Sequence, residues 1–239
     1  MELLGKTVFV TGAARRLGRM LAVHLHKKGC GLVIHYNKSE RDAGDLQREI
    51  GCRLFHADFT QISMSMLETR LKEEVGSIDV LVNNASSFQE RNWEDVDEKT
   101  WDYDLDVNLK TPFFLARHFG RLMKAKGCGK ILNMTDIAAE HPYLKHLPYS
   151  IARAGVVAFT RALARALAPE VQVNAIAPGT ILFPEEMPKA TREAILKNIP
   201  AHRTATPDEF LRTVDFLLEG GDYITGQTIV LDGGRSLAW

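Results

Sequence analysis

The stretch Thr7-Val8-Phe9-Val10-Thr11-Gly12-Ala13-Ala14-Arg15-Arg16-Leu17-Gly18-Arg19 decides the fold of this chain. It begins as a run of β-branched and aromatic residues, breaks at Gly12, and continues with helical periodicity through Leu17, Leu21 and Leu25. A strand, a glycine turn and a helix N-terminus in this order present backbone N–H groups and a positive helix end to a pyrophosphate. The stretch therefore predicts a dinucleotide-binding turn.

Arg16 occupies the position where a T-G-x-x-x-G-x-G pattern has its middle glycine. A glycine there allows close approach of the backbone to a dinucleotide, whereas an arginine places a fixed cation over the phosphates or the substrate. Surface loops also use glycine turns, but the position directly after a buried strand favours a binding turn.

Short apolar runs alternate with segments of helical length along the chain. Most runs are continuously hydrophobic, which is typical of strands buried on both faces of a parallel sheet. The expected strands are Thr7–Thr11, Leu32–Tyr36, Arg53–Asp58, Val80–Asn83, Lys130–Met134, Val171–Ala177 and Thr228–Asp232. The expected helices are Arg16–Lys28, Ser39–Ile50, Ile62–Val75, Lys99–Lys124, Tyr149–Ala168 and Pro207–Glu219. We predict one domain over residues 1–239, an α/β doubly wound Rossmann fold with a seven-stranded parallel sheet.

The segment Phe183–His202 does not fit this alternation. It carries Pro184, Pro188 and Pro200 around a short helical stretch, Ala190–Lys197. It follows the carboxyl end of a predicted strand, where ligands of open α/β sheets lie. We expect a lid over the substrate, and the alternative is a surface excursion without a catalytic role.

Composition excludes several classes of protein. The chain has 30 basic and 30 acidic residues, so no overall charge favours nucleic acid or an anionic membrane as a partner. No apolar run reaches the length of a spanning helix, and Met1–Lys6 leaves no room for a signal peptide. Cys30, Cys52 and Cys128 match no zinc spacing, and the eight histidines are scattered. We expect a cytoplasmic protein with reduced thiols and no bound metal.

The second predicted strand ends in His35-Tyr36-Asn37-Lys38-Ser39. In a dinucleotide fold, a carboxylate here would accept hydrogen bonds from an unphosphorylated adenosine ribose, and this chain has none before Glu40. An imidazole, an ammonium and a hydroxyl, with Arg15 and Arg16 nearby, suit a 2′-phosphate instead. We therefore predict NADPH rather than NADH, the alternative being that Lys38 and Arg41 only solvate a loop.

Two further strand ends carry candidate residues. Asp58 follows the third strand, where it would accept from an adenine amino group or, alternatively, cap the following helix. The fourth strand leads into Asn83-Asn84-Ala85-Ser86-Ser87-Phe88, whose small residues allow the backbone to approach a flat ring. Phe88 is either a stacking platform for a planar heterocycle or a core residue at the root of a loop.

The last candidate group is Asp136, Tyr149 and Arg153. Tyr149 and Arg153 are four residues apart on a predicted helix, and Asp136 follows a strand that ends at the same edge of the sheet. A tyrosine that acts as a general acid benefits from a cation that stabilises its phenolate, by roughly 4 kcal/mol before desolvation for a pair about 4 Å apart. The alternative is an amphipathic helix with an exposed Arg153 and a capping Asp136.

Together these residues resemble the short-chain dehydrogenase/reductase superfamily over essentially the whole chain. The matching pieces are Thr11-Gly12 with Gly18, Asn83-Asn84-Ala85, Asn108, Tyr149, Pro178-Gly179 and Asp232-Gly233-Gly234. Within the superfamily, the chain looks most like pteridine reductases and bacterial dihydromonapterin reductases. The residues that say so lie in Thr11–Arg19, His35–Ser39, Asn83–Phe88, Thr135–Asp136 and Leu167–Phe183. Most superfamily members have serine where Asp136 stands.

The resemblance implies an NADPH-dependent reductase that transfers hydride to a C=N bond of a dihydropterin, such as dihydromonapterin, dihydrobiopterin or dihydrofolate. It implies a homotetramer, with Arg161 and Arg165 near a neighbouring subunit. The implied catalytic residues are Asp136, Tyr149, Arg153 and Asn108. The implied substrate contacts are Arg16, Ser86, Phe88, Asp136 and Tyr149. The implied cofactor contacts are Gly12, Arg15, Arg16, Leu17, His35, Tyr36, Asn37, Lys38, Ser39, Asp58, Asn84, Ala85, Ser86, Thr135, Tyr149, Arg153, Pro178, Gly179, Thr180 and Ile181.

One residue departs from the family pattern, which has lysine at the position of Arg153. Arginine can hold the nicotinamide ribose but is effectively never deprotonated, so it cannot pass a proton onward. We therefore expect a slower enzyme in which water recharges Tyr149 through Asp136. Two alternatives stay open. One is a carbonyl reductase of the same superfamily, although the carboxylate of Asp136 would repel a developing alkoxide. The other is a weakly active NADP(H)-binding regulatory protein.

Overall fold

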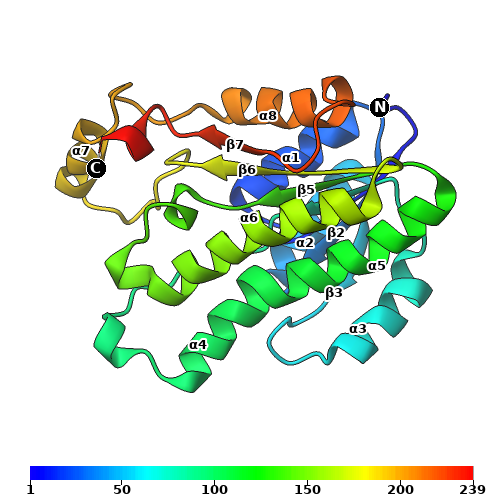
Figure 1. The fold of residues 1–239 in the computed structure, drawn as a ribbon, viewed down its shortest axis with the longest axis horizontal. Coiled ribbons are helices and arrows are strands. Elements are labelled where there is room, and N and C mark those ends of the chain that lie inside the picture. Colours follow the sequence, from blue (N-terminus) through cyan, green and yellow to red (C-terminus); the bar gives the residue numbers. More distant parts are fainter. Residues whose placement is uncertain (239) are drawn as a thin grey trace.

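The computed structural model describes residues 1–238, which form a parallel β-sheet with helices on both faces (Figure 1). Within these residues the sheet has seven strands in the order β3-β2-β1-β4-β5-β6-β7, and every pairing is parallel. The strands are β1 (Thr7–Val10), β2 (Gly31–Tyr36), β3 (Arg53–His56), β4 (Val80–Asn83), β5 (Gly129–Met134), β6 (Val171–Pro178) and β7 (Thr228–Leu231). The predicted doubly wound Rossmann fold is confirmed.

Three of the predicted helices are interrupted or extended by a π-helical turn. The α-helices are α1 (Arg16–Lys27), α2 (Glu40–Ile50), α3 (Met64–Arg70), α4 (Glu98–Leu105), α5 (Thr111–Lys126), α6 (Leu147–Leu167), α7 (Lys189–Lys197) and α8 (Pro207–Asp215). The π-helical turns are η1 (Leu71–Val75), η3 (Asp106–Lys110) and η6 (Phe216–Gly220). A π-turn adds one residue without breaking the apolar stripe, so the sequence pattern gave no sign of it. Of the helices in residues 1–238, none is both long and apolar enough to cross a bilayer.

The two faces of the sheet have separate cores. Val8 and Val10 pack with apolar residues of α1, α2 and α8, whereas Phe9 belongs to the core beneath α3, α5 and α6. The Phe9 ring meets the Phe55 and Phe119 rings edge-on, with centroids 5.8 and 5.7 Å away. Successive side chains of a strand point to opposite faces, so a strand that is buried on both faces reads as a continuous apolar run.

Local signals in the sequence set the helix boundaries. Gly51 directly follows α2, and Gly127 directly follows α5. Their φ angles of 66° and 86° lie in the left-handed region that favours glycine. Pro112 lies in the first turn of α5. Helix α8 begins with a capping box between Thr206 and Glu209.

The order of the strands reverses at β1, which pairs with β2 on one side and β4 on the other. Ligands of open α/β sheets bind at such a point, outside the carboxyl ends of the strands. Here the turn after β1 packs closely on the loop after β4. Gly12 has a φ of 62°, and a Cβ there would lie 2.7 Å from the Ala85 Cα. The close approach therefore requires glycine at this position.

Candidate active site

Side chains from neighbouring strands hold the turn after β1 in place. Asn84 Nδ2 donates to the carbonyl oxygens of Thr11 and Gly12, at 2.8 and 3.1 Å. Thr11 Oγ1 accepts from the backbone N–H groups of Asn84 and Ala85, both at 2.9 Å. A Cβ at Gly18 would lie 2.4 Å from the Gly12 oxygen. The turn thus has a fixed shape that depends on both glycines.

Arg16 adopts a backbone conformation that favours glycine. Its φ is 51°, in the left-handed region, which costs a non-glycine residue roughly 1–2 kcal/mol. Its guanidinium Nη2 donates to the Leu182 oxygen at 3.0 Å, so the side chain joins the turn to the segment after β6. The predicted cation lies at the binding turn and also contacts the residue that precedes the predicted lid.

The imidazole of His35 does not lie where we expected it, facing a phosphate. The ring is buried and stacks on Phe59 with the centroids 4.0 Å apart. Its Nδ1 accepts from the Gly12 N–H at 3.1 Å, and Nε2 donates to the Ala57 oxygen at 3.0 Å. Burial lowers the pKa of His35 to about 4, so the ring is neutral at physiological pH. With both nitrogens engaged and no charge, His35 supports the turn instead of supplying a cation.

A cleft of about 660 Å³ lies at these turns. Among the described residues that line it, Arg15, Arg16 and Lys38 are cations and none is a carboxylate, so the cleft suits an anionic ligand. The predicted cofactor and substrate residues that line it are Gly12, Arg15, Arg16, Leu17, His35, Tyr36, Asn37, Lys38, Ser39, Asn84, Ala85, Ser86 and Phe88. Pro184, from the predicted lid, also lines it.

The other predicted cofactor residues are not part of this lining. Asp58 Oδ1 accepts from the backbone and hydroxyl of Thr60 at 2.9 and 2.8 Å, while Ser63 caps α3. Asp58 thus caps a turn rather than the following helix. Burial opposes ionisation of Asp58, but the Thr60 hydrogen bonds outweigh it and lower the pKa of this carboxyl. Thr135 donates to the Arg153 oxygen at 2.9 Å. Pro178 is the last residue of β6, and residues 179–181 follow it at the same edge of the sheet.

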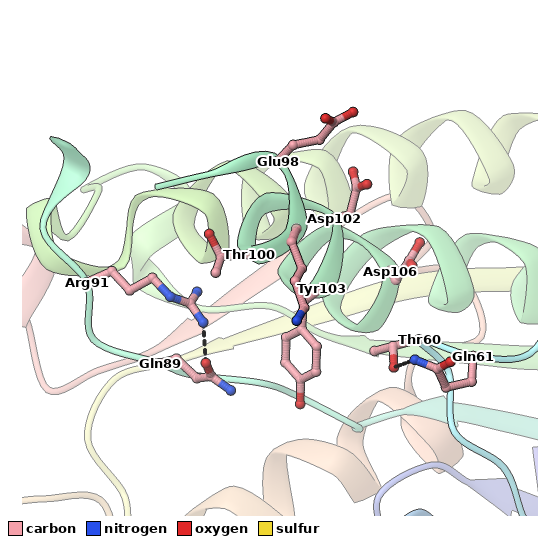
Figure 2. A pocket seen from close by; sticks show the side chains of 10 residues that line it. Thr60, Gln61, Gln89, Arg91, Glu98, Thr100, Asp102, Tyr103 and Asp106 are labelled. Atoms are coloured by element: carbon pink, nitrogen blue, oxygen red, sulfur yellow. Dashed lines mark hydrogen bonds between the residues drawn. The ribbon is translucent and has the colours of Figure 1, made fainter. Parts of the chain in front are cut away.

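Figure 2 shows a second cavity, of about 610 Å³, beside the turn after β3 and the first half of α4. Its walls carry Glu98, Asp102 and Asp106 as well as Arg91 and Lys99, so both signs of charge are present. The predicted site residues, all of which the structure describes, are absent from these walls. The mixture of charges does not select a nucleotide phosphate, whereas the charged side chains that line the cleft at the glycine turn are all cations.

Asp136 and Tyr149 form a hydrogen-bonded pair. Tyr149 donates its hydroxyl to Asp136 Oδ2 at 2.8 Å, and Asp136 Oδ1 accepts from the Ala138 N–H at 2.8 Å. Burial raises the pKa of the Asp136 carboxyl, against the hydrogen bonds that favour its ionised form. Burial also raises the pKa of Tyr149 above its ordinary value, although the Arg153 charge opposes this. The pair therefore favours its protonated forms.

Arg153 is 3% exposed, which excludes the alternative of an exposed arginine on an amphipathic helix. Its Nη1 donates to the Met134 oxygen at 2.9 Å and its Nη2 donates to Ser86 Oγ at 2.7 Å. The guanidinium carbon lies 4.8 Å from the centroid of the Tyr149 ring. The buried Nε finds no hydrogen-bond partner within the described part of the chain.

Asn108 is joined to this group through the loop after β4. It lies in the π-helical turn η3 and is fully buried. Its Oδ1 accepts from Ser86 Oγ at 3.2 Å and from the Ser87 N–H at 3.1 Å, and its Nδ2 donates to Ser87 Oγ at 2.7 Å. The structure thus brings together the four residues expected to be catalytic, with Ser86 as the link between Asn108 and Arg153.

Phe88 is 55% exposed and lines the cleft, so the alternative of a core residue is excluded. The ring stacks on His146, with centroids 3.8 Å apart, and meets the Tyr149 ring edge-on at 4.8 Å. Sequence reasoning missed His146 and Tyr143. Tyr143 is close to Phe88, and burial together with Asp136 raises its pKa. The only sign in the sequence that His146 and Tyr143 belong to the site was their position, three and six residues before Tyr149.

The segment after β6 has internal hydrogen bonds of its own. Arg192 of α7 donates from Nε to the Met187 oxygen at 2.9 Å and from Nη2 to the Pro184 and Glu185 oxygens at 3.0 and 2.7 Å. Pro184 is the member of this segment that lines the cleft. The hydrogen bonds of Arg192 thus hold the start of this segment together. That the segment 183–202 acts as a lid over the substrate stays a prediction.

The chain is similar to known oxidoreductases over nearly its whole length. The family model described as enoyl-(acyl carrier protein) reductase matches residues 12–236. Among solved structures, FolM alternative dihydrofolate reductase 1 from Brucella canis, in complex with NADP, is 33% identical. The match has a TM-score of 0.88 and covers 100% of this chain and 97% of that one.

Two curated relatives of similar identity have names that indicate other substrates. An NAD-dependent glycerol dehydrogenase from Listeria innocua is 33% identical over 97% of this chain and 94% of its own length. The 3-oxoacyl-[acyl-carrier-protein] reductase FabG from Staphylococcus epidermidis is 32% identical over 97% and 99%. Because these identities are nearly equal, overall similarity does not select a substrate, and the choice depends on the residues of the site.

Proposed function

This chain belongs to the short-chain dehydrogenase/reductase superfamily, and we propose that it is an NADPH-dependent reductase of a dihydropterin. It is an NADP-dependent oxidoreductase of that superfamily, and the proposal concerns its substrate. The observation that carries the proposal is the partly buried Asp136 carboxyl, 2.8 Å from the Tyr149 hydroxyl. A carboxyl group can accept hydrogen bonds from the ring N–H and amino groups of a pterin, whereas a ketone oxygen needs a donor from the protein.

The residues of the cleft fit the cofactor. Arg15 and Arg16 would hold the pyrophosphate end, and Lys38 with Ser39 would hold the 2′-phosphate, because charge-assisted hydrogen bonds favour phosphate oxygens. Arg153 donates to Ser86 Oγ, and Ser86 lines the cleft, so this pair would support the nicotinamide end of the cofactor. When bound, NADPH supplies the hydride that the reaction needs.

Phe88 supports a planar substrate. Its ring is packed on His146 on one face, so its orientation is fixed, and more than half of its surface is open to solvent. A flat, nitrogen-rich ring would stack on it. Arg16 and Ser86, which line the same cleft, would contact the substrate from the phosphate turn and from the loop after β4.

The Asp136–Tyr149 pair would deliver the proton that accompanies the hydride. Burial raises the pKa of Asp136, so the carboxyl holds a proton at higher pH than an exposed aspartate does. Tyr149 donates to that carboxyl and is itself held beside the Arg153 charge. Arg153 cannot release a proton, so we propose that water restores the proton to Tyr149 through Asp136.

The proposal is tested by NADPH oxidation, followed by absorbance, with dihydromonapterin, dihydrobiopterin, dihydrofolate and a set of simple ketones. We expect turnover with at least one dihydropterin, and turnover with ketones alone would overturn the pterin assignment. Asp136→Ser is the discriminating variant, because it replaces the carboxyl with the residue that most of the superfamily has. We expect it to lose about 100-fold or more in kcat with the dihydropterin while still binding NADPH.

A further inference from the structure

A continuous chain of hydrogen bonds leads from Arg153 to a buried carboxylate that the sequence did not single out. Arg153 Nη2 donates to Ser86 Oγ at 2.7 Å, and Ser86 Oγ donates to Asn108 Oδ1 at 3.2 Å. From the other side of the same amide, Asn108 Nδ2 donates to Ser87 Oγ at 2.7 Å. Ser87 Oγ then donates to Asp104 Oδ1 at 2.5 Å. The chain thus connects a cation to an anion through three neutral side chains.

The two charged ends fix the direction of the links between them. A guanidinium can only donate and a carboxylate can only accept, so each hydroxyl and the amide donate towards Asp104. Ser86 Oγ has a second acceptor in the Ser87 oxygen at 3.3 Å, which points the hydroxyl in the same general direction. Hydrogen bonds aligned in one direction polarise and strengthen one another in a buried site. The carboxylate therefore determines which way the Asn108 amide faces.

Asp104 is suited to this task by its surroundings. It lies in α4 and is 1% exposed, whereas Asp102 on the same helix is exposed. Besides Ser87, it accepts from Arg91 Nη1 at 3.3 Å, so its charge is balanced where it is buried. Arg91 reaches it from the second cavity, where the guanidinium also donates to Gln89 (Figure 2).

We propose that Asp104 is a positioning residue for Arg153. It orients Asn108 and, through Ser86, which lines the cleft, holds the guanidinium in place beside Tyr149. Asp104 does not touch the reacting atoms, and its effect is transmitted by the hydroxyl and amide groups between them. The proposal rests on the proposed function only for the position of the cofactor, and it holds whichever substrate the enzyme reduces.

The test is a double-mutant cycle with Asp104→Asn and Ser87→Ala, read by fluorescence titration of NADPH and by kcat. Each variant interrupts the same chain, so we expect each to weaken NADPH binding about ten-fold, and the double variant to lose no more than either one alone. Asp102→Asn removes an exposed carboxylate two residues away on the same helix, and we expect it to bind NADPH as the wild type does.

Unchanged NADPH affinity in both single variants, or losses that add in the double variant, would overturn the proposal. Ser87→Ala removes a single hydroxyl, so it alone decides the question if Asp104→Asn fails to fold. The NADPH titration does not use a pterin. A wild-type protein that binds NADPH but reduces no dihydropterin would therefore contradict the proposed substrate and leave the test of Asp104 intact.

Discussion

Tyr149 donates its hydroxyl proton to Asp136 across 2.8 Å, while the Arg153 guanidinium carbon lies 4.8 Å from the centre of the tyrosine ring. A phenol, a carboxyl and a permanent cation therefore lie next to one another, the phenol and the cation buried and the carboxyl partly so. The two groups that can release a proton are the tyrosine and the aspartate, and burial raises the pKa of both. Their protonation belongs to the pair rather than to either residue.

The pH dependence of kcat tests the role of Asp136. Reduction needs the protonated carboxyl, and burial raises the pKa of Asp136, so we expect kcat to hold at acidic pH and to fall as pH rises through that raised pKa. Asp136→Asn should lower kcat by about 100-fold and remove this fall. The measurement is kcat at saturating substrate over the whole pH range in which the protein stays folded. A wild-type kcat that is constant over this range would contradict the assignment.

Replacing Arg153 with lysine tests whether arginine slows the enzyme. Lysine can pass on a proton, but its single nitrogen cannot reproduce the separate bonds of Arg153 to the Met134 oxygen and Ser86 Oγ. We expect Arg153→Lys to raise kcat and to lower the free energy of unfolding by about 1–2 kcal/mol. Arg153→Met, which removes the cation, should lower kcat instead. If lysine leaves kcat unchanged in the purified protein, the arginine is no handicap.

The buried imidazole of His35 predicts a loss of stability in mild acid. Its pKa is about 4 in the folded protein and near 6.5 when exposed, so the unfolded chain binds the additional proton between these values. Stability should therefore fall by roughly 3 kcal/mol as pH decreases from 6.5 to 4. Chemical denaturation of wild type and His35→Gln at several pH values measures the difference in slope. Equal slopes would show that His35 is not buried and neutral, and His56→Gln, on the exposed side of β3, serves as the control.

The charge at Lys38 predicts the choice between NADPH and NADH. Lys38 lines the cleft at the end of β2, and no carboxylate is found among the described residues of that lining. We expect Lys38→Glu to weaken NADPH binding at least ten-fold while changing NADH binding little, because a charge-assisted bond to phosphate is lost and a repulsion added. Lys27→Glu makes the same change of charge at an exposed position of α1. An unaltered ratio of the two dissociation constants would place the 2′-phosphate elsewhere.

The strands were predictable because each is a short apolar run, and such a run can be recognised without knowing which other segments pack against it. Strand β4 was predicted at its observed bounds, Val80–Asn83, and most of the others differ by one residue at one end. The π-turn at Asp106–Lys110 was not predicted, since a helix keeps its apolar stripe across one added residue.

The side chains were harder to predict because their surroundings come from distant parts of the chain. His35 lies three residues before Lys38 in the sequence, which suggests a cationic loop. In the structure, however, the imidazole ring stacks on Phe59, which follows β3. Nothing in the sequence separates Asp104 from Asp102, yet the structure buries Asp104 against Ser87 and leaves Asp102 exposed. The homotetramer, with Arg161 and Arg165 near a neighbour, stays a prediction.

The π-helical turn at Asp106–Lys110 has a consequence for insertions and deletions in this chain. It is one residue longer than the α-helical turn that it replaces, and each residue of an α-helix corresponds to a rotation of about 100°. Removing one residue there would let α4 and α5 merge into a regular helix, and the side chains within the turn, Asn108 among them, would then point in other directions. Asn108 and Asp104 could no longer both reach Ser87. The length of this segment is therefore under tighter constraint than its composition.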